Sequence, residues 1–187
     1  MKKLIVYAIA GVLLFGCSNP KPKTETDSGK AGKNLIEITN DMENAAAIIP
    51  SWINEKTVIA MNVPAAHSGK FASVTNDTME YGYGYQELLE NINTGLPKSV
   101  FLSGWIYTTE AKPNLAIILD ISENAVNFDW KSFPLNDSLT ETGKWIEFTT
   151  SFYFEKPLKP EQMIKIFPWN QSKKTVYIDD LKIRFNY

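Results

Sequence analysis

The chain has 187 residues, of which 44% are hydrophobic and 12% aromatic, so it carries enough apolar side chains for one core of ordinary size. Its formal net charge is −2 at neutral pH, and no basic stripe with interleaved aromatic residues occurs along it. This charge pattern excludes a nucleic-acid-binding protein.

The first sixteen residues have the pattern of an export signal. Lys2 and Lys3 precede an apolar run at 4–15, which is followed by Gly16. Such a run is typical of a cleaved signal peptide, whereas a membrane-spanning helix needs about 20 apolar residues. We therefore predict a signal peptide at 1–16 and no membrane-spanning segment. Without the two lysines of the signal, 17 basic side chains remain against 21 acidic ones.

Cys17 is the only cysteine of the chain, so an exported protein offers it no partner for an intramolecular disulfide. The segment Leu14-Phe15-Gly16-Cys17 resembles the lipobox of bacterial lipoproteins, in which a small residue precedes a lipidated cysteine. The resemblance implies cleavage before Cys17, palmitate or a similar acyl chain on the new N-terminus, and a lipid anchor in the bacterial cell envelope. We expect the outer membrane. An ordinary cleaved signal with an incidental cysteine is the alternative.

The segment that follows has the composition of a tether. Residues 18–33 contain two prolines, two glycines and several lysines, but no large apolar residue. Such a stretch cannot bury a core and is typical of an extended, flexible linker. We therefore predict a lipidated cysteine and linker at 17–33 and a folded domain at 34–187.

Within the predicted domain the hydrophobic period is two, and β-branched and aromatic residues dominate the periodic stretches. Only 86–91 predicts a short helical turn. In the stretch 145–154, apolar residues alternate with mixed ones, which indicates one buried and one exposed face. We predict an all-β fold in which two antiparallel sheets pack face to face as a β-sandwich. Its clearest strands are expected at 58–63, 70–75, 99–107, 114–121, 145–154, 163–168 and 175–185.

Several segments of the domain, in consecutive order, resemble the jelly-roll carbohydrate-binding modules of bacterial polysaccharide degraders, the galactose-binding-like group. They are Met42-Glu43-Asn44 with Trp52, 66–74 around Ser68-Gly69-Lys70, 102–106 with Gly143-Lys144-Trp145, and 176–183 around Asp179-Asp180. The departure is Met42, where the family usually has phenylalanine. The resemblance covers nearly all of 34–187 and implies a jelly roll that binds carbohydrate without catalysis.

The same resemblance implies a structural calcium ion at the edge of the sandwich. Its ligands would be Glu43, carbonyl oxygens of Ser68 and Lys70, and Asp179. Calcium takes about six to eight oxygen ligands, and a mixture of carboxylates and carbonyls suits it. Successive strand residues point to opposite faces, so Asp179 and Asp180 cannot face one ion without a bulge. The alternative is that both acids lie at a solvated strand edge.

Aromatic residues are the candidate sugar contacts, because pyranose C–H faces pack on rings while hydroxyls bind flanking polar groups. In an extended conformation, the stretch 81–85 would place three tyrosines on one face; its alternative is a loop over the rim of the core. Trp130 lies in a loop-like stretch, 127–131. The candidate ligand-binding residues are Tyr81, Tyr83, Tyr85, Trp105, Tyr107 and Trp130.

The other aromatic residues are assigned by strand parity and position. Trp105 and Tyr107 share a strand face opposite Leu102 and Ile106, so they would lie outside if the latter two are in the core. Three further tryptophans are interpreted as packing residues: Trp52, Trp145 and Trp169.

Catalytic machinery is sparse. The only histidine, His67, precedes Ser68 in a predicted turn, and we expect it to order that turn. The chain has no G-x-S-x-G motif, zinc-type histidine pair or phosphate-binding glycine loop. No two carboxylates are placed by spacing for glycoside hydrolysis, since Asp179 and Asp180 are expected to diverge. We therefore expect no enzyme.

A structural or protein-docking lipoprotein of the envelope is the competing interpretation. Exposed aromatic residues serve protein interfaces as readily as sugar sites. The segment 167–170 and the closing strand are similar to small lipoproteins of Bacteroidota-like bacteria that carry this module alone. A module without an attached catalytic domain fits this alternative as well as it fits glycan binding.

Overall fold

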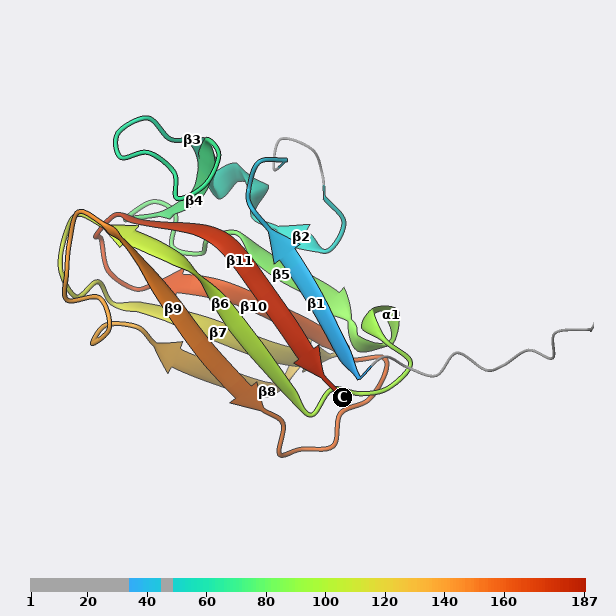
Figure 1. The fold of residues 1–187 in the computed structure, drawn as a ribbon. Helices are drawn as coiled ribbons and strands as arrows, with labels where there is room; N and C mark the ends of the chain where they lie inside the picture. Colours follow the sequence, from blue (N-terminus) through green and yellow to red (C-terminus); the bar gives the residue numbers. More distant parts are fainter. Residues whose placement is uncertain (1–33, 45–48) are drawn as a thin grey trace, which may run out of the picture.

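The structure is a computed structural model that describes residues 34–44 and 49–187 (Figure 1). The predicted signal peptide, Cys17 and the linker lie outside the described residues. Among residues 34–44 and 49–187, no helix has the length and apolar character that crossing a bilayer requires.

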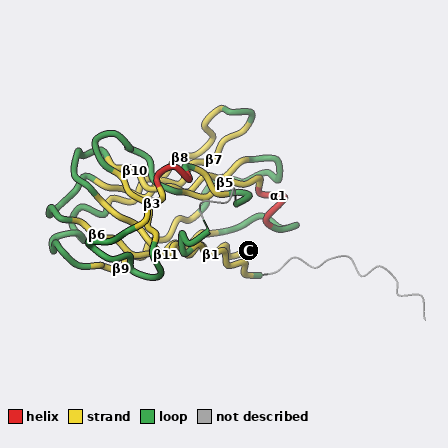
Figure 2. The backbone as a smooth tube through the Cα atoms, turned by 90° about the horizontal axis from the view of Figure 1, so that it is seen from above, coloured by secondary structure: helices red, strands yellow, loops and turns green. Residues whose placement is uncertain are grey.

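Two antiparallel sheets form a sandwich, which confirms the predicted all-β class. One sheet has six strands: β3 (Val58–Ala60), β4 (Phe71–Thr75), β11 (Val176–Asn186), β6 (Ser99–Thr108), β9 (Trp145–Tyr153) and β1 (Leu35–Asn40). In this sheet β6 pairs with one edge of β11, and β4 and β1 pair with successive parts of its other edge. Five strands form the other sheet in this order: β2 (Trp52–Ile53), β5 (Gly84–Leu88), β10 (Met163–Asn170), β7 (Leu115–Glu123) and β8 (Val126–Pro134). In Figure 2 the two sheets appear as separate layers, with β5, β7 and β8 in one and β6, β9 and β11 in the other.

The core fills the space between the sheets, and the period of two in the sequence decides which side chains enter it. On β6, Leu102 and Ile106 are buried, whereas Trp105 and Tyr107 are only partly buried on the outer face. On β7 the inward side chains Leu115, Ile117, Leu119 and Ile121 are all fully buried. Each such side chain stabilises the fold by about 1.5–3 kcal/mol relative to exposure to water.

The helical segments are short. A 3-10 turn, η1 (Glu55–Thr57), follows β2, and a single α-helical turn, α1 (Leu89–Ile92), follows β5. The helical turn predicted at 86–91 is therefore half right, because the chain remains a strand as far as Leu88. The strand part was missed because Gln86 and Glu87 break the apolar alternation.

The loop-like prediction for 127–131 is wrong, since these residues belong to β8. This is an edge strand with both faces largely exposed, so its polar residues give no hydrophobic alternation. A two-residue turn at Asn124 and Ala125 joins it to β7, and both residues have positive φ, as a tight hairpin turn requires.

A bulge interrupts β11 at Asp179 and Asp180. Strand β4 pairs with β11 up to Ile178, and β1 pairs with it from Leu181 onward, so the bulge lies in the gap between these two partners. Asp180 has a φ of 50°, outside the extended region. The expectation that the two carboxylates diverge is therefore wrong, because the bulge brings both to the same turn.

Candidate functional site

Two of the three tyrosines in the predicted platform lie in the core. Tyr83 is 1% exposed and stacks on Trp52 with 5.3 Å between ring centroids, while Tyr85 is 4% exposed and meets Trp52 edge-on. Burial raises the pKa of the Tyr85 hydroxyl. Tyr83 and Tyr85 therefore cannot contact a ligand at the surface. Tyr83 and Tyr85 do share a face, as predicted, but it is the face that packs into the core.

Tyr81 behaves differently because it precedes β5. It forms an isolated bridge with Trp169, and the chain bends before the regular pairing of β5 starts at Gly84. The ring of Tyr81 is 46% exposed. Tyr81 is thus the one tyrosine of the stretch that remains a surface candidate.

Trp105 and Tyr107 lie on the outer face of the six-stranded sheet, as their strand parity predicts, but the β3–β4 loop covers Trp105. The imidazole of His67 stacks on the indole at 3.9 Å between centroids, with 14° between the ring planes. Nearby, the Trp145 Nε1–H donates a 3.0 Å hydrogen bond to the carbonyl of Ala65. A sugar cannot use a Trp105 face on which His67 is stacked.

Carboxylates hold this loop in place from the bulge of β11. Asp179 Oδ2 accepts hydrogen bonds from the backbone N–H groups of His67 (3.0 Å) and Ser68 (3.2 Å). Asp180 accepts one from the Ser68 hydroxyl at 2.7 Å and contacts His67 Nδ1 at 2.6 Å. The Asp179 side chain is fully buried, and this burial raises its pKa to about 6. His67 therefore orders the turn, as expected.

The four residues predicted to bind calcium, Glu43, Ser68, Lys70 and Asp179, lie around one turn. Glu43 Oε1 accepts hydrogen bonds from the N–H groups of Lys70 and Phe71, at 2.7 and 2.9 Å. Both Asp179 oxygens also accept backbone N–H groups, and the Lys70 carbonyl accepts the N–H of Met61. Among the described residues, no group of three or more acidic, histidine or cysteine side chains is arranged to hold a metal ion. These hydrogen bonds tie the carboxylates to the turn, and the calcium ion stays a prediction.

A second group of aromatic side chains lies on the outer face of the five-stranded sheet, and we call it the aromatic row. Trp169 is its centre: Tyr81 lies nearly parallel to it at 6.2 Å, and Trp130 meets it edge-on at 6.2 Å. Phe167 meets Tyr81 edge-on at 5.8 Å. Tyr81 and Trp130, at 46% and 47% exposed, form the two accessible ends of the row.

Residues of β7 pack under the aromatic row, and Glu80 hydrogen-bonds to its central ring. Ala116 and Ile118 point outward from β7 and lie outside the core cluster, yet they are buried, because large side chains such as Trp169 and Phe167 on the paired strand flank them. Glu80 fixes the central indole by accepting a 2.7 Å hydrogen bond from Trp169 Nε1. The rings are therefore held in place before any ligand arrives.

A line of polar side chains runs beside the aromatic row. Strand register places Gln86 next to Lys165, Lys165 next to Asp120, and Asp120 next to Trp130. Asp120 accepts a 2.6 Å hydrogen bond from Asn127, while the Lys165 ammonium has no hydrogen bond or ion pair to any described residue. Hydrogen-bond donors and acceptors thus lie next to an apolar ring surface.

Sequence reasoning found the two ends of the row, Tyr81 and Trp130, and missed its centre. The sequence assigns Trp169 to packing, and it does pack against Tyr81 and Trp130, but on the outer face and not in the core. The signal was present in β10, where Lys165, Phe167 and Trp169 share a parity opposite to the buried Ile164 and Ile166. The packing interpretation is right for Trp52, which is in the core.

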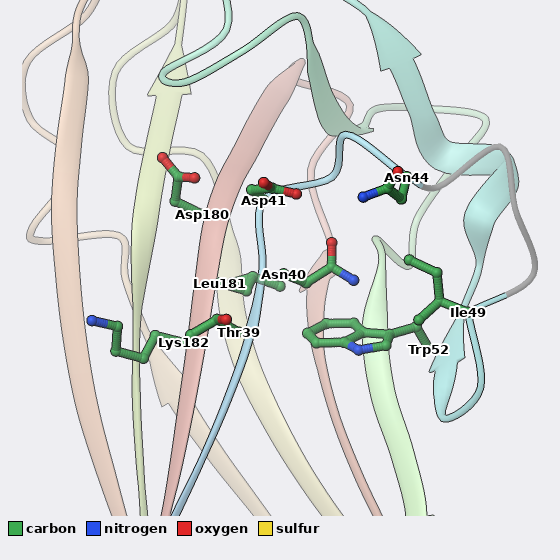
Figure 3. A pocket seen from close by; sticks show the side chains of 9 residues that line it. All are labelled: Thr39, Asn40, Asp41, Asn44, Ile49, Trp52, Asp180, Leu181 and Lys182. Carbon is green, nitrogen blue, oxygen red and sulfur yellow. The ribbon is translucent and has the colours of Figure 1, made fainter.

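A separate pocket of about 450 Å³ lies at the end of β1, beside the bulge of β11 (Figure 3). Lys182 lies on one side of it and Trp52 on the other, with Asp41, Asp180 and Asn44 at one end. Trp52 is only 9% exposed and Asp180 is engaged by His67 and Ser68, so neither is available as a sugar contact. The pocket shares no residue with the aromatic row.

No protein-family model matches the chain, and no curated protein sequence does either. Solved structures do. The chain is similar to two domains of Xyn10C from Paenibacillus barcinonensis. For the CBM22-1 xylan-binding domain the TM-score is 0.50 at 16% identity, over 80% of this chain and 93% of that one. For the CBM22-2 xylan-binding domain the TM-score is 0.52 at 15% identity, over 80% and 99%. These matches establish a shared fold with carbohydrate-binding modules.

Proposed function

We propose that the protein binds carbohydrate without catalysis on the outer face of its five-stranded sheet. The observation that carries this proposal is the aromatic row of Tyr81, Trp169 and Trp130, with exposed rings at both ends and polar side chains alongside. Sugar rings present C–H groups on their faces and hydroxyls at their edges, so they match such a surface. The xylan-binding domains that share the fold support the proposal.

The charge of this face favours a neutral glycan. Lys165 lies beside Asp120, and Glu80 lies beside the central indole, so neither sign of charge dominates. An ammonium donates to hydroxyl oxygens, and carboxylates accept from hydroxyl hydrogens. A strongly acidic polymer would instead meet the carboxylates of Glu80 and Asp120 without a matching excess of cations.

We further propose that lipidation of Cys17 attaches this module to the outer membrane of a bacterial envelope. The export signal and the lipobox-like residues before Cys17 support this part of the proposal. The linker at 17–33 would let the module stand away from the membrane and reach a polymer. The predicted calcium ligands Glu43 and Asp179 contact the β3–β4 loop on the six-stranded sheet, so calcium would not touch the aromatic row.

The test is a glycan array probed with residues 34–187 and, in parallel, with the full mature chain. The array is read for the wild type, for Trp130→Ala on the aromatic row, and for Trp105→Ala as a matched control under the β3–β4 loop. We expect selective binding that Trp130→Ala removes and Trp105→Ala leaves intact. Binding that both variants retain would contradict the proposed face.

A silent array from a folded protein would contradict glycan binding itself. In that case the aromatic row would be assigned to a polypeptide partner of the envelope, the competing interpretation from the sequence. Recovery of a stoichiometric protein from membranes, lost with Trp130→Ala, would be the corresponding observation.

A further inference from the structure

A small pocket lies at the Tyr81 end of the aromatic row. It has a volume of about 270 Å³, and its walls come from η1 with Asn54 before it and from the turn that precedes β5. The residues that matter for a ligand are Lys56, Thr78, Met79, Glu80 and Tyr81. This pocket is distinct from the one in Figure 3, with which it shares no residue.

Two residues connect the pocket to the aromatic row. Tyr81 lines the pocket and lies nearly parallel to Trp169, and Glu80 lines the pocket while holding the Trp169 indole. Asn54 donates a 3.1 Å hydrogen bond from its side chain to the carbonyl of Gly82, which fixes the far wall to the chain just after Tyr81. Pocket and row therefore meet at Glu80 and Tyr81, the two residues that they share.

The walls offer the contacts that one sugar residue needs. Met79 and the Tyr81 ring are apolar, while Lys56 provides a donor and Glu80 an acceptor. The Lys56 ammonium has no hydrogen bond or ion pair to any described residue, so it is available to a ligand. Adjacent hydroxyls both donate and accept, so they can use both side chains at once. The volume lies below the range of pockets for drug-sized ligands and suits a single residue.

We propose that this pocket is a subsite for one neutral sugar residue beyond those on the aromatic row, with Lys56 and Glu80 as its hydroxyl contacts. The inference rests on the proposed carbohydrate function and adds to it a preference among glycans. The extra residue is either the terminal sugar of a linear chain or a single-sugar branch. Both have the same chemistry, and the experiment separates them.

The experiment uses immobilised β-1,4-linked xylose, glucose, mannose and galactose oligosaccharides of increasing length. Each backbone is presented linear, linear with a methylated non-reducing end, and with one branch sugar. Two variants alter the pocket: Lys56→Ala removes the donor, and Thr78→Trp fills the space. Their matched controls, Lys98→Ala and Thr94→Trp, change exposed residues that do not line the pocket. Trp130→Ala reports on the row itself.

We expect both pocket variants to weaken binding about tenfold for glycans that reach the pocket, the cost of one lost polar contact, and to leave shorter glycans unaffected. Sensitivity to end methylation assigns the subsite to a chain terminus, and a preference for branched glycans assigns it to a branch. Pocket variants that bind every glycan like the wild type, while Trp130→Ala does not, would overturn the subsite and leave the proposed function standing. Absence of binding to all glycans would overturn both.

Discussion

The buried carboxyl of Asp179 makes a testable prediction about stability and pH. In the folded protein burial raises its pKa to about 6, from an ordinary value of 3.8. The folded state therefore favours the protonated form, so the contribution of Asp179 to stability is present below about pH 4 and is lost as the pH rises through about 6. The difference between the two pKa values corresponds to about 3 kcal/mol of unfolding free energy.

The assay is urea unfolding at a series of pH values in buffer with chelator, for the wild type and for Asp179→Asn. The asparagine places an NH₂ group against a backbone N–H donor, which adds a pH-independent cost of about 1–3 kcal/mol. It does not titrate, however. The stability advantage of the wild type over the variant should therefore shrink by up to about 3 kcal/mol between pH 4 and 6.5. An advantage that stays constant over this range would refute the reasoning.

Calcium reverses the expectation, which makes the same assay a test of the predicted ion. A cation bound to Asp179 would favour the ionised carboxylate and hold its pKa low, so the wild type would no longer lose stability as the pH rises. If saturating calcium leaves the unfolding curves at pH 7 unchanged, the calcium prediction from the sequence is contradicted.

Three further predictions concern the aromatic residues and the anchor. Tyr81→Ala should weaken glycan binding about tenfold or more in isothermal titration, and Trp105→Ala less than about twofold, because His67 stacks on the Trp105 ring; equal losses would contradict this. Tyr83→Ala should lower the unfolding free energy by about 3–5 kcal/mol in urea, as expected for a buried aromatic side chain, and a neutral result would place Tyr83 outside the core. Cys17→Ser should abolish palmitate labelling and release the full-length protein from the membrane fraction, whereas retention at the membrane would exclude the lipid anchor.

Alternation within single strands was predictable from sequence because it needs only the parity of neighbouring residues. Leu102 and Ile106 enter the core and Trp105 does not, as the pattern indicated. The same argument would have placed Trp169 outside, had it been applied to β10. The edge strand β8 could not be predicted in this way, because both of its faces are largely exposed to solvent and it has no hydrophobic alternation.

Features that depend on contacts between distant segments could not be read from the chain. The bend before β5 decides that Tyr81 points outward while Tyr83 and Tyr85 enter the core. Likewise, parity placed Trp105 on an outer face, but only the folded chain brings His67 onto its ring. Tertiary contacts determine whether an outward aromatic residue is free to bind.

The contrast between the two aromatic faces is the strongest physical argument for the location of the binding site. On the six-stranded sheet the protein covers Trp105 with its own loop and fixes that loop through Asp179 and Asp180. Ordering such a loop costs conformational entropy, so the coverage indicates that exposed indole surface is unfavourable in this fold. On the five-stranded sheet, by contrast, no loop among the described residues covers Tyr81 and Trp130, which remain exposed to solvent. Exposed rings beside a polar line suit a ligand that is apolar on its face and polar at its edge, and a sugar chain has that character along its whole length.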